Sequence, residues 1–593
     1  MAHETRRAAR EARLAAETAA DRAPTAGSAK RSRRRRIWIT VAIVLAVLLV
    51  ASAWVLFRAV TVKSELEQAQ SLIKASDDGL STEARIAAVG DHAAKAAEAA
   101  GDPVWRVMEW VPIVGDNLRA VRLSSESIDV LANRIGSPIL RALTSGGEGS
   151  PLATALPILE AQSPTVSDLA QGLAGVKSSP FLIGPVADAV AQIDGVMATA
   201  APALHVLPAL LGADGEKNYL LVFQNNAEAL PLGGSAASQT LISASGGKLS
   251  IVAQAGSGNF VEGNAVDVPV DESAISLYSP YLVDHVNTTT SRPDFPTAAT
   301  LLRAFWQRDI RPDRIDGVIS IDPIALGRVL LATGPITVGD TELTSKNAVS
   351  VLLKDVYARW DPAASKADAA ASDAFFAAVA SSVFEKIASG SFDAKDMAWA
   401  VGTGIDNGDI LVWMEDPDVA SAFAGQRIAG VLPRDNADKT VVGVYFRDTS
   451  ASKIDYYMDS SASLVRTCDA GQSTFTATAE LHLDISQSAA DDLPGYVQSR
   501  MWGASQFRTE VFVYGPPGTT FASASEEGRE VRPIHTDIDD LGRPVAAFET
   551  YLQPEEKASV TATFTGTGDF GPLELRTTPM INPTAKTLDD PCR

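Results

Sequence analysis

Asn218–Val252 reads NYLLVFQNNAEALPLGGSAASQTLISASGGKLSIV. The stretch begins with an apolar run, Tyr219–Phe223, that is typical of a buried strand. The residues that follow are polar or turn-forming, namely Gln224, Asn225, Asn226, Glu228, Pro231, Gly233 and Gly234. Because buried strands seldom contain such a run, we interpret it as a tight turn between two strands, with the asparagines bonding nearby backbone. A binding site with a phosphate-cradling turn is the alternative, although the pattern is neither GxGxxG nor GxxxxGKS.

The residues around this stretch, 206–435, alternate strand and helix patterns. The candidate strands are Tyr219–Phe223, Thr240–Ala244, Leu249–Ala253, Gly317–Ile321 and Ile336–Val338. The candidate helices are Thr297–Gln307, Pro323–Ala332, Ser345–Trp360 and Ala367–Ile387. Strands interleaved with helices predict an α/β or α+β domain in this part of the chain.

The regions on either side have different patterns. Residues 436–593 change to a period of two, as in STFTATAELHLDIS (473–486), which predicts a C-terminal antiparallel β-sandwich. Residues 58–205 are rich in alanine, with apolar residues at three- and four-residue spacing, and predict a helical membrane-proximal bundle or stalk. Its side chains Trp105, Trp110, Val111 and Ile113 are interpreted as core residues rather than as membrane contacts. The chain as a whole is predicted to be a multidomain α+β protein.

A membrane anchor is the strongest prediction from the N-terminal region. Ile37–Phe57 is a run of 21 residues without charge, and at about 1.5 Å per residue a helix of this length crosses a hydrocarbon core of about 30 Å. The basic residues of 1–36 precede it, so the positive-inside rule places this tail in the cytoplasm and residues 58–593 outside. A cleaved signal peptide is the alternative, because Ala51-Ser52-Ala53 matches an A-x-A site.

Charge and cysteine content narrow the possible partners. Residues 1–36 contain eleven Lys/Arg and four Asp/Glu, a local charge of +7, so the remainder carries −28 of the total of −21. A surface this acidic repels nucleic acid, which we therefore exclude as a partner. The two cysteines have no CxxC partner and the six histidines form no HxH or HExxH pair, so no metal site is predicted. In an oxidising compartment Cys468 and Cys592 are expected to form a disulfide.

Several segments together resemble the DUF4012 family, bacterial envelope proteins of unknown function. The matching segments, in chain order, are EWVPIVGDNLRAV (109–121), NYLLVFQNNAEALPLGG (218–234), RPDFPTAA (292–299), IDGVISIDPIALGRVLLATGPITV (315–338), LTSKNAVSVLLKDVYARW (343–360) and SASKIDYYM (450–458). The resemblance covers roughly residues 58–470. The family usually has arginine before Pro-Thr-Gly-Gly, whereas this chain has Leu230 before Pro231-Leu232-Gly233-Gly234.

A weaker resemblance is to the LytR–CpsA–Psr phosphotransferases, which attach glycopolymers to peptidoglycan. The layout of a short cytoplasmic tail, one span and an extracytoplasmic α/β domain is similar, and Val318–Val338 looks like a segment of that family. The resemblance implies a polyprenyl pyrophosphate site made of arginines and aspartates. Arg359 matches one of these positions, but the family's R-S-D and P-R-D motifs are missing.

Candidate chemical groups lie near the predicted strand 317–321. Asp316 and Asp322 flank it and could bind Mg²⁺ or act as acid and base. Asp322-Pro323 is also typical of a helix start, with Asp as N-cap, and this is the interpretation that we favour; Asp316 is interpreted as a turn residue. A nearby set could bind pyrophosphate, although surface salt bridges are the favoured interpretation: Arg292, Asp294, Arg311, Arg314 and Arg328.

We expect a single-pass protein of the cell membrane that binds or scaffolds an envelope component, such as a surface polysaccharide or its assembly proteins. This expectation is non-catalytic and involves no cofactor. The first alternative is a divergent phosphotransferase acting on lipid-linked glycopolymer, with Mg²⁺ and a catalytic set made of Arg292, Asp294, Asp316, Arg328 and Arg359. The second is a structural receptor for a protein partner.

Overall fold

The computed structural model describes residues 26–74, 80–144, 150–527, 529–530 and 533–592. It contains two compact units. The first, called the helical unit, is Met1–Arg134 with Asp168–Ala198; the second, called the sheet unit, is Ile135–Ser167 with Thr199–Arg593. Of the predicted cytoplasmic tail, residues 1–25 lie outside the described residues. The predicted domain boundaries at 205 and 435 stay predictions.

The helical unit is built from helices with well-defined starts. Its helices are α2 (Ala26–Lys74), α3 (Thr82–Ala100), α4 (Pro103–Met108), α5 (Val114–Asp129) and parts of α7 (Pro151–Lys177) and α8 (Gly184–Leu210). Ser81 caps α3 by accepting a hydrogen bond from the Ala84 amide at 3.2 Å, and Asp102 caps α4 ahead of Pro103. Alanines such as Ala93 and Ala96 are buried without a large side chain, which lets the helices approach closely.

The predicted core role of the stalk aromatics is only partly correct. Trp105 is buried, and its indole N–H donates to the Leu118 carbonyl oxygen at 2.9 Å. Trp110, however, is 89% exposed and Ile113 is 61% exposed. The core interpretation was therefore wrong for these two residues. They follow the end of α4, in a turn that α5 does not cover, whereas Trp105 lies on the face of α4 that packs against the other helices.

Helix α2 contains the predicted span Ile37–Phe57. Most of the large apolar side chains that are described there are exposed, with Val55 buried; the exposed ones include Trp38, Ile39, Val41, Ile43, Val47, Leu49, Val50, Trp54, Leu56 and Phe57. Among the residues searched, the helices found to be long and apolar enough to cross a membrane are α8 and α15 (Lys366–Ala388). In α15, Phe375, Val379 and Val383 are buried in a core cluster, as in a core helix of a water-soluble domain.

The sheet unit begins with a five-stranded sheet of order β3-β2-β1-β4-β7. Its strands are β1 (Lys217–Leu230), β2 (Gly233–Ser245), β3 (Lys248–Gly256), β4 (Gly317–Ile321) and β7 (Ile410–Met414). Strands β1 and β4 are parallel and the other pairs are antiparallel. The sheet confirms a mixed α and β chain. Strand β7 was not predicted, and the predicted strand Ile336–Val338 (β5) pairs with β6 (Thr341–Leu343) in a separate two-stranded sheet.

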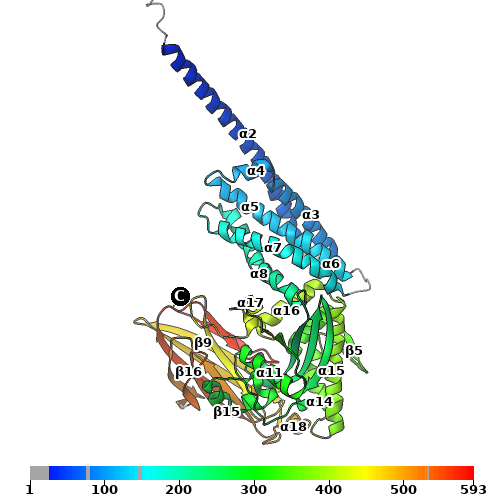
Figure 1. Ribbon diagram of the computed structural model, residues 1–593. Coiled ribbons are helices and arrows are strands. Elements are labelled where there is room, and N and C mark those ends of the chain that lie inside the picture. Colours follow the sequence, from blue (N-terminus) through cyan, green and yellow to red (C-terminus); the bar gives the residue numbers. More distant parts are fainter. Residues whose placement is uncertain (1–25, 75–79, 145–149, 528, 531–532, 593) are drawn as a thin grey trace, which may run out of the picture. The chain divides into compact units, whose positions relative to one another are not determined.

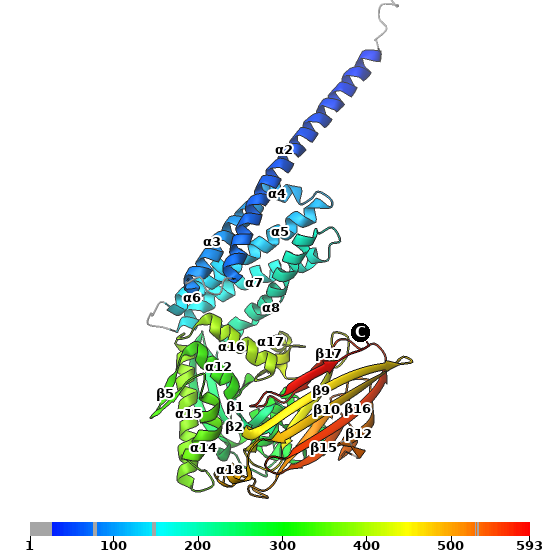
Figure 2. The same ribbon diagram turned by 180° about the vertical axis from the view of Figure 1, so that it is seen from behind.

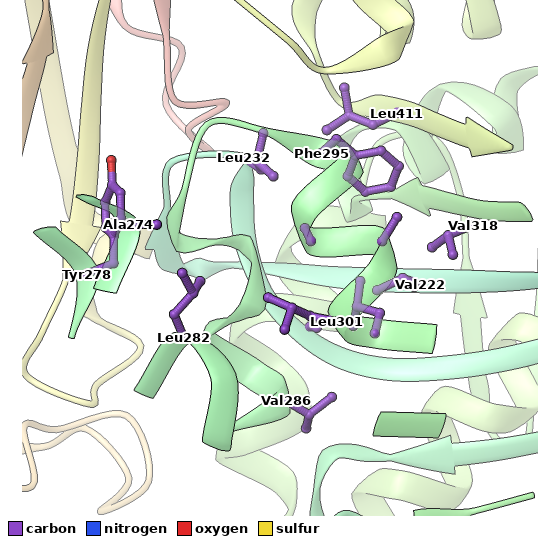
Figure 3. Packing of buried hydrophobic residues seen from close by; sticks show 14 of the residues in the cluster. Val222, Leu232, Ala274, Tyr278, Leu282, Val286, Phe295, Leu301, Val318 and Leu411 are labelled. Atoms are coloured by element: carbon purple, nitrogen blue, oxygen red, sulfur yellow. The ribbon is translucent and has the colours of Figure 1, made fainter. Parts of the chain in front are cut away.

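Helices cover this sheet and share its core. Helix α11 (Phe295–Asp309) contributes Phe295 and Leu301 to a cluster with Val222 of β1 and Val318 of β4, as Figure 3 shows. A second cluster joins α12 (Pro323–Thr333) to α15. The predicted helix 345–360 is interrupted: it is observed as α13 (Ala348–Ser350), a π-helical turn η4 (Val351–Asp355) and α14 (Val356–Arg359). Helix α16 (Ala394–Asn407) precedes β7.

The remaining strands form two sheets that enclose a core, visible in Figures 1 and 2. The six-stranded sheet has the order β13-β12-β16-β10-β9-β18 and the five-stranded sheet β14-β15-β11-β8-β17. Their bounds are β8 Thr440–Asp448, β9 Met458–Asp469, β10 Gln472–Leu483, β11 Phe507–Tyr514, β12 Thr520–Glu526, β13 Arg529–Glu530, β14 His535–Asp540, β15 Arg543–Leu552, β16 Lys557–Thr567, β17 Leu573–Thr577 and β18 Ala585–Asp589. The period-two residues of β10 that were expected on one face are buried.

The prediction of a purely antiparallel sandwich was wrong at two edges. Strand β17 pairs in parallel with β8, and β18 pairs in parallel with β9. After β16 the chain crosses to the other sheet and back, so that each last strand is added to an edge without a hairpin, and only a hairpin requires the antiparallel direction. Periodicity shows which face of a strand is buried but not which neighbour it joins.

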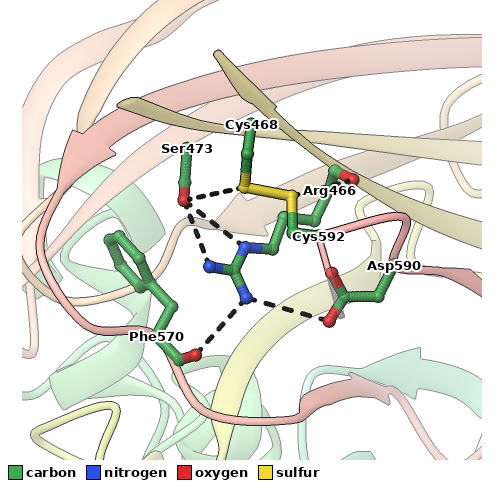
Figure 4. The surroundings of a disulfide bond; sticks show 6 residues. All are labelled: Arg466, Cys468, Ser473, Phe570, Asp590 and Cys592. Carbon is green, nitrogen blue, oxygen red and sulfur yellow. Dashed lines mark hydrogen bonds and ion pairs between the residues drawn. A yellow bond between two sulfur atoms is a disulfide. The ribbon is translucent and has the colours of Figure 1, made fainter. Parts of the chain in front are cut away.

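A disulfide ties the last strand to the sandwich. Cys468 near the end of β9 is bonded to Cys592, 124 residues later, with a Cα–Cα distance of 5.8 Å. Figure 4 shows Arg466 beside it, with its guanidinium 3.3 Å from the Phe570 carbonyl oxygen and 3.8 Å from the Asp590 carboxylate. The bridge and this arginine hold the exposed edge strand β18 in place.

Candidate functional site

The tight turn predicted between two strands is present, but it is shorter than predicted: residues 224–230 of the polar run belong to the strand itself. Strand β1 continues to Leu230, and the turn is confined to Pro231-Leu232. The register between β1 and β2 shifts between Phe223 and Gln224 and again between Asn225 and Ala229. Such bulges turn side chains out of the regular alternation of a strand. The polar residues 224–228 therefore lie within a sheet, but at positions where the regular pairing of β1 with β2 is interrupted.

The two buried asparagines of this run donate to partners far away in sequence. Asn225 Nδ2 donates to the Tyr357 hydroxyl at 2.8 Å, while its Oδ1 accepts from the Ala227 amide at 3.0 Å. Asn226 Nδ2 donates to Asp322 Oδ2 at 2.9 Å and to the Pro579 carbonyl oxygen at 3.1 Å. These bonds offset the loss of water and explain why a polar sequence is stable inside the fold.

Gly233 and Gly234 serve the close approach of two strands. Gly233 has φ +131°, and a Cβ there would lie 2.3 Å from Gln224 Oε1. A Cβ on Gly234 would lie 2.2 Å from the Asn225 carbonyl oxygen. At Gly234 the contact is with backbone, so any other residue would require the strand to move, whereas at Gly233 the contact is with a side chain and the positive φ is what disfavours other residues. The glycines are thus explained by packing, and they do not line the cavity described below.

A buried lysine faces the polar run. Lys453, in the segment SASKIDYYM, forms an ion pair with Glu228, which also accepts a hydrogen bond from Ser235 Oγ. Lys453 Nζ lies 5.0 Å from the ring centre of Tyr357 and 4.7 Å from that of Tyr496. Burial lowers the pKa of Lys453, but Glu228 and the two tyrosines outweigh this and raise the pKa above its ordinary value. The lysine is a permanent cation held between aromatic rings.

These side chains border a cavity of about 1030 Å³ inside the sheet unit. Part of its wall is apolar, from α12, η4 and α15, and includes Leu326, Leu352, Leu353, Phe376 and Val379. The sandwich side and the loop 494–503 supply polar groups, including Arg447, Lys453, Tyr496, Arg500 and Arg508. The volume is at the upper end of what small-molecule sites occupy.

Two groups in the wall have unused binding capacity. Gln224 is buried, and its Nε2 has no hydrogen-bond partner among the described residues. Two other arginines in the wall, Arg447 and Arg508, are by contrast already paired with Glu510, at 3.1 Å and 2.8 Å. Arg500 is exposed and has no carboxylate partner in the part of the chain that the structure describes; its guanidinium lies 6.0 Å from the ring centre of Tyr496. A ligand in the cavity could accept from both groups.

The five residues of the predicted catalytic set lie apart from this cavity. None of them lines it. Arg292 is buried and bonded to Asp540 and Asp271, each at 2.6 Å, so the surface salt-bridge interpretation was wrong for it. Asp294 caps α11 and lies 4.0 Å from Arg292.

The other three members of that set have separate partners. Asp316 accepts from the Asn218 amide at 2.9 Å and pairs with Arg314 at 2.8 Å. Arg328 pairs with Asp409. Arg359 is exposed and pairs with Asp340 at 2.7 Å. Among the described residues no hydrogen bond or ion pair joins these three to one another or to Arg292, and Arg311 pairs with Asp313 at 3.2 Å.

The predicted binding residues divide into two groups. Asn225 and Glu228 line the cavity, whereas Asn226, Gly233 and Gly234 support its wall from behind. Sequence reasoning missed Lys453, although the segment containing it had been noted for its family resemblance. Arg500 and Arg508 carry no motif that could have indicated them. Within the described ranges no three acidic, histidine or cysteine side chains gather to hold a metal ion.

Asp322 is the N-cap of α12, as predicted. Its Oδ1 accepts from the Ala325 amide at 2.8 Å, and Pro323 occupies the first turn. The carboxyl group is also completely buried and bonded to Asn226. Burial first, and then the nearby Asp409, raise the pKa of Asp322 to about 8. The cap therefore links the polar run of β1 to α12 through a group that titrates near neutral pH.

Replacing Asp322 with asparagine should flatten the dependence of stability on pH. Below about pH 4 the carboxyl group is protonated in both the folded and the unfolded chain. Between about 4 and 8 only the folded chain keeps the proton, so the free energy of unfolding falls as pH rises, by up to about 1.4 kcal/mol per pH unit. Asparagine can still cap the helix and does not titrate.

The measurement is urea unfolding at pH 5.5 and 7.5, chosen to lie within that window, for the full chain in detergent. The control is Asp416→Asn, because Asp416 caps α17 (Pro417–Ser421) on the exposed surface and should leave the pH dependence of the wild type unchanged. An equal pH dependence in Asp322→Asn and in the wild type would refute the assignment.

Comparison with known proteins supports one of the two resemblances. Residues 214–357 match the sequence profile of the DUF4012 family, described as a protein of unknown function. The predicted resemblance to that family is confirmed for this segment, which includes the polar run, α11, Asp322 and Tyr357. Neither a curated protein nor a solved structure matches the chain. The resemblance to the LytR–CpsA–Psr phosphotransferases stays a prediction.

Proposed function

We propose that this chain, with its DUF4012 segment, is a membrane-anchored protein that binds a surface polysaccharide of the cell envelope in the cavity of the sheet unit. The observation that carries the proposal is the wall of that cavity. Three of the segments that resemble the family motifs meet there: Asn225 and Glu228 come from 218–234, Tyr357 from 343–360 and Lys453 from 450–458. Motifs separated by more than 200 residues in sequence thus contribute to one site.

The chemistry of the wall suits a sugar polymer. Sugars offer many hydroxyl groups, which need both donors and acceptors, and they also have apolar ring faces that stack on aromatic side chains. Gln224 Nε2 is a donor without a partner among the described residues, Glu228 is a half-buried acceptor, and Tyr496 and Phe376 offer partly exposed rings. Arg500 would pair with an acidic group of the polymer, since guanidinium groups bind carboxylates and phosphates well.

The anchoring part of the proposal rests on α2. Its apolar stretch has exposed side chains along the described part of Trp38–Phe57, which water would not favour in a helix of this length. The basic residues before it are more numerous than those after it, so we place the N-terminus in the cytoplasm and residues 58–593 outside the cell membrane. A polysaccharide of the envelope is available on that side.

The test is a calorimetric titration of the full chain in lipid nanodiscs with oligosaccharides released from the surface polysaccharides of its own cell. We expect binding that Arg500→Ala weakens by about tenfold, because a charged hydrogen bond contributes about 1.4 kcal/mol or more. The matched control is Arg434→Ala, which removes an exposed arginine outside the cavity and should change Kd by less than about twofold. Equal affinities of the Arg500 and Arg434 variants would exclude the cavity as the site.

A further inference from the structure

One end of the helical unit exposes an apolar tip made of two loops. Six large apolar side chains there are exposed: Val107, Trp110, Ile113 and Val114 around the α4–α5 turn, and Phe181 and Ile183 between α7 and α8. The residues 110–115 and 178–187 contain no charged side chain. Single exposed apolar residues are common on proteins, but a gathered, uncharged set with a tryptophan is typical of an interaction surface.

The two loops are fixed to each other. Asn117 Nδ2 donates to the Phe181 carbonyl oxygen at 2.8 Å, and its Oδ1 accepts from the Ile183 amide at 2.9 Å. Ser179 Oγ donates to Asp116 Oδ2 at 2.6 Å. Asn117 and Asp116 belong to the segment EWVPIVGDNLRAV, whose first half builds the tip while Leu118 joins the core of the unit.

The α4–α5 turn is itself held in an unusual conformation. Gly115 lies so close to the preceding turn that a Cβ would be 2.0 Å from the Glu109 carbonyl oxygen. Ile113 has φ +73°, which is rare for a β-branched residue and is held only where the surroundings require it. The backbone at Ile113 is therefore strained, and its side chain is exposed to solvent.

The tip lies beside the end of the apolar stretch of α2. Trp105 of α4 packs in one cluster with Val55 and Val62 of α2, and Arg58 pairs with Asp102 at 3.4 Å. Within this unit, Figures 1 and 2 both show the first part of α2 running beyond the bundle at the end where α4 lies. The exposed loops are therefore at the level at which the apolar stretch Ile37–Phe57 ends.

We propose that the tip inserts into the outer interface of the bilayer, next to α2. Tryptophan and other aromatic side chains favour the headgroup level of a membrane, and a short uncharged apolar loop can enter it without burying a charge. The inference rests on the proposed span of α2. Its consequence is that the helical unit contacts the membrane at two places, which fixes its tilt instead of leaving it free to swing about a single helix.

The experiment uses an environment-sensitive thiol probe on the full chain in nanodiscs of phosphatidylcholine and phosphatidylglycerol. The two native cysteines are bonded to each other, so an introduced cysteine is labelled selectively. Trp110→Cys and Ile183→Cys report on the tip, and Leu49→Cys reports on α2. Glu83→Cys is the control. Glu83 is exposed at the start of α3, about 25 Å along the helix from its end at Ala100, which precedes α4 and the tip.

We expect blue-shifted emission and at least twofold quenching by lipids with a nitroxide on the acyl chain at positions 49, 110 and 183, and no quenching at 83. Quenching at 49 without quenching at 110 and 183 would overturn the inference and leave the span intact. No quenching at 49 would overturn the span, and the inference would fall with it. A blue shift at 110 and 183 without nitroxide quenching would show a protein partner or a second copy on the tip, and would also overturn the inference.

Discussion

Replacing Arg292 with alanine is expected to lower the free energy of unfolding of the sheet unit by about 3–5 kcal/mol, because it breaks a buried ion pair from one side. The guanidinium donates to Asp540 through Nε at 3.1 Å and through Nη2 at 2.6 Å. Asp540 is completely buried and is bonded besides to Tyr514 and Ser273. Without the arginine a buried carboxylate loses its counter-charge, and β14 loses its connection to the segment before α11.

The matched control is Arg359→Ala. Both arginines belonged to the predicted catalytic set, but Arg359 is exposed and pairs with an exposed Asp340. Solvent screens this pair, so we expect the urea midpoint to stay that of the wild type. Equal urea midpoints for the two variants, with loss of a metal-dependent phosphotransfer in both, would instead favour the enzymatic alternative. Urea unfolding of the full chain in detergent is followed by near-ultraviolet circular dichroism. This signal reports on the network because Tyr278 and Tyr514 lie next to it.

Removing the disulfide is expected to destabilise the sandwich by about 2–5 kcal/mol, the range found for disulfides that close long loops. The bond joins Cys468 to Cys592 and holds β18, whose five residues are all exposed and which pairs only with β9 among the described strands. In the double variant Cys468→Ser with Cys592→Ser, the unfolded chain gains freedom and the edge strand is held by few contacts.

When reductant is added, the unfolding temperature of the wild type should fall to that of the double variant. The unfolding temperature of the double variant should not change. Limited proteolysis should then release the residues after β17 from the double variant first, since a cut after β17 leaves no disulfide to hold them. A wild type whose unfolding temperature is the same with and without reductant would contradict this expectation.

Features set by neighbouring residues could be predicted from the sequence. The alternation from Phe475 to Ile485 predicted a strand with one buried face, because side chains in a strand point to opposite sides. Asp322-Pro323 predicted a helix start, because an aspartate cap and a proline in the first turn act within four residues. The apolar runs of β1 and β4 also predicted strands, because the pattern lies within a few consecutive residues.

Features set by distant partners could not be predicted. The polar run of β1 is stable in a sheet only because Tyr357, Asp322 and Pro579 reach it from 96 to 353 residues away. Trp105 and Trp110 lie five residues apart in one segment, yet only the packing of α2 and α5 decides that the first is buried and the second exposed. The cavity residues Arg500 and Arg508 come from a loop and a strand without any local pattern.

The measurement that tests the central claim most directly is hydrogen exchange of the full chain in nanodiscs, with and without the oligosaccharide that binds in the titration. The polar wall of the cavity includes Tyr496 and Arg500 in the loop 494–503, and Ser257 and Glu262 in the loop after β3. If the cavity holds the polysaccharide, exchange slows in both loops and stays unchanged in β18. Slowing that is confined to regions outside the cavity, with both loops unchanged, would contradict the account.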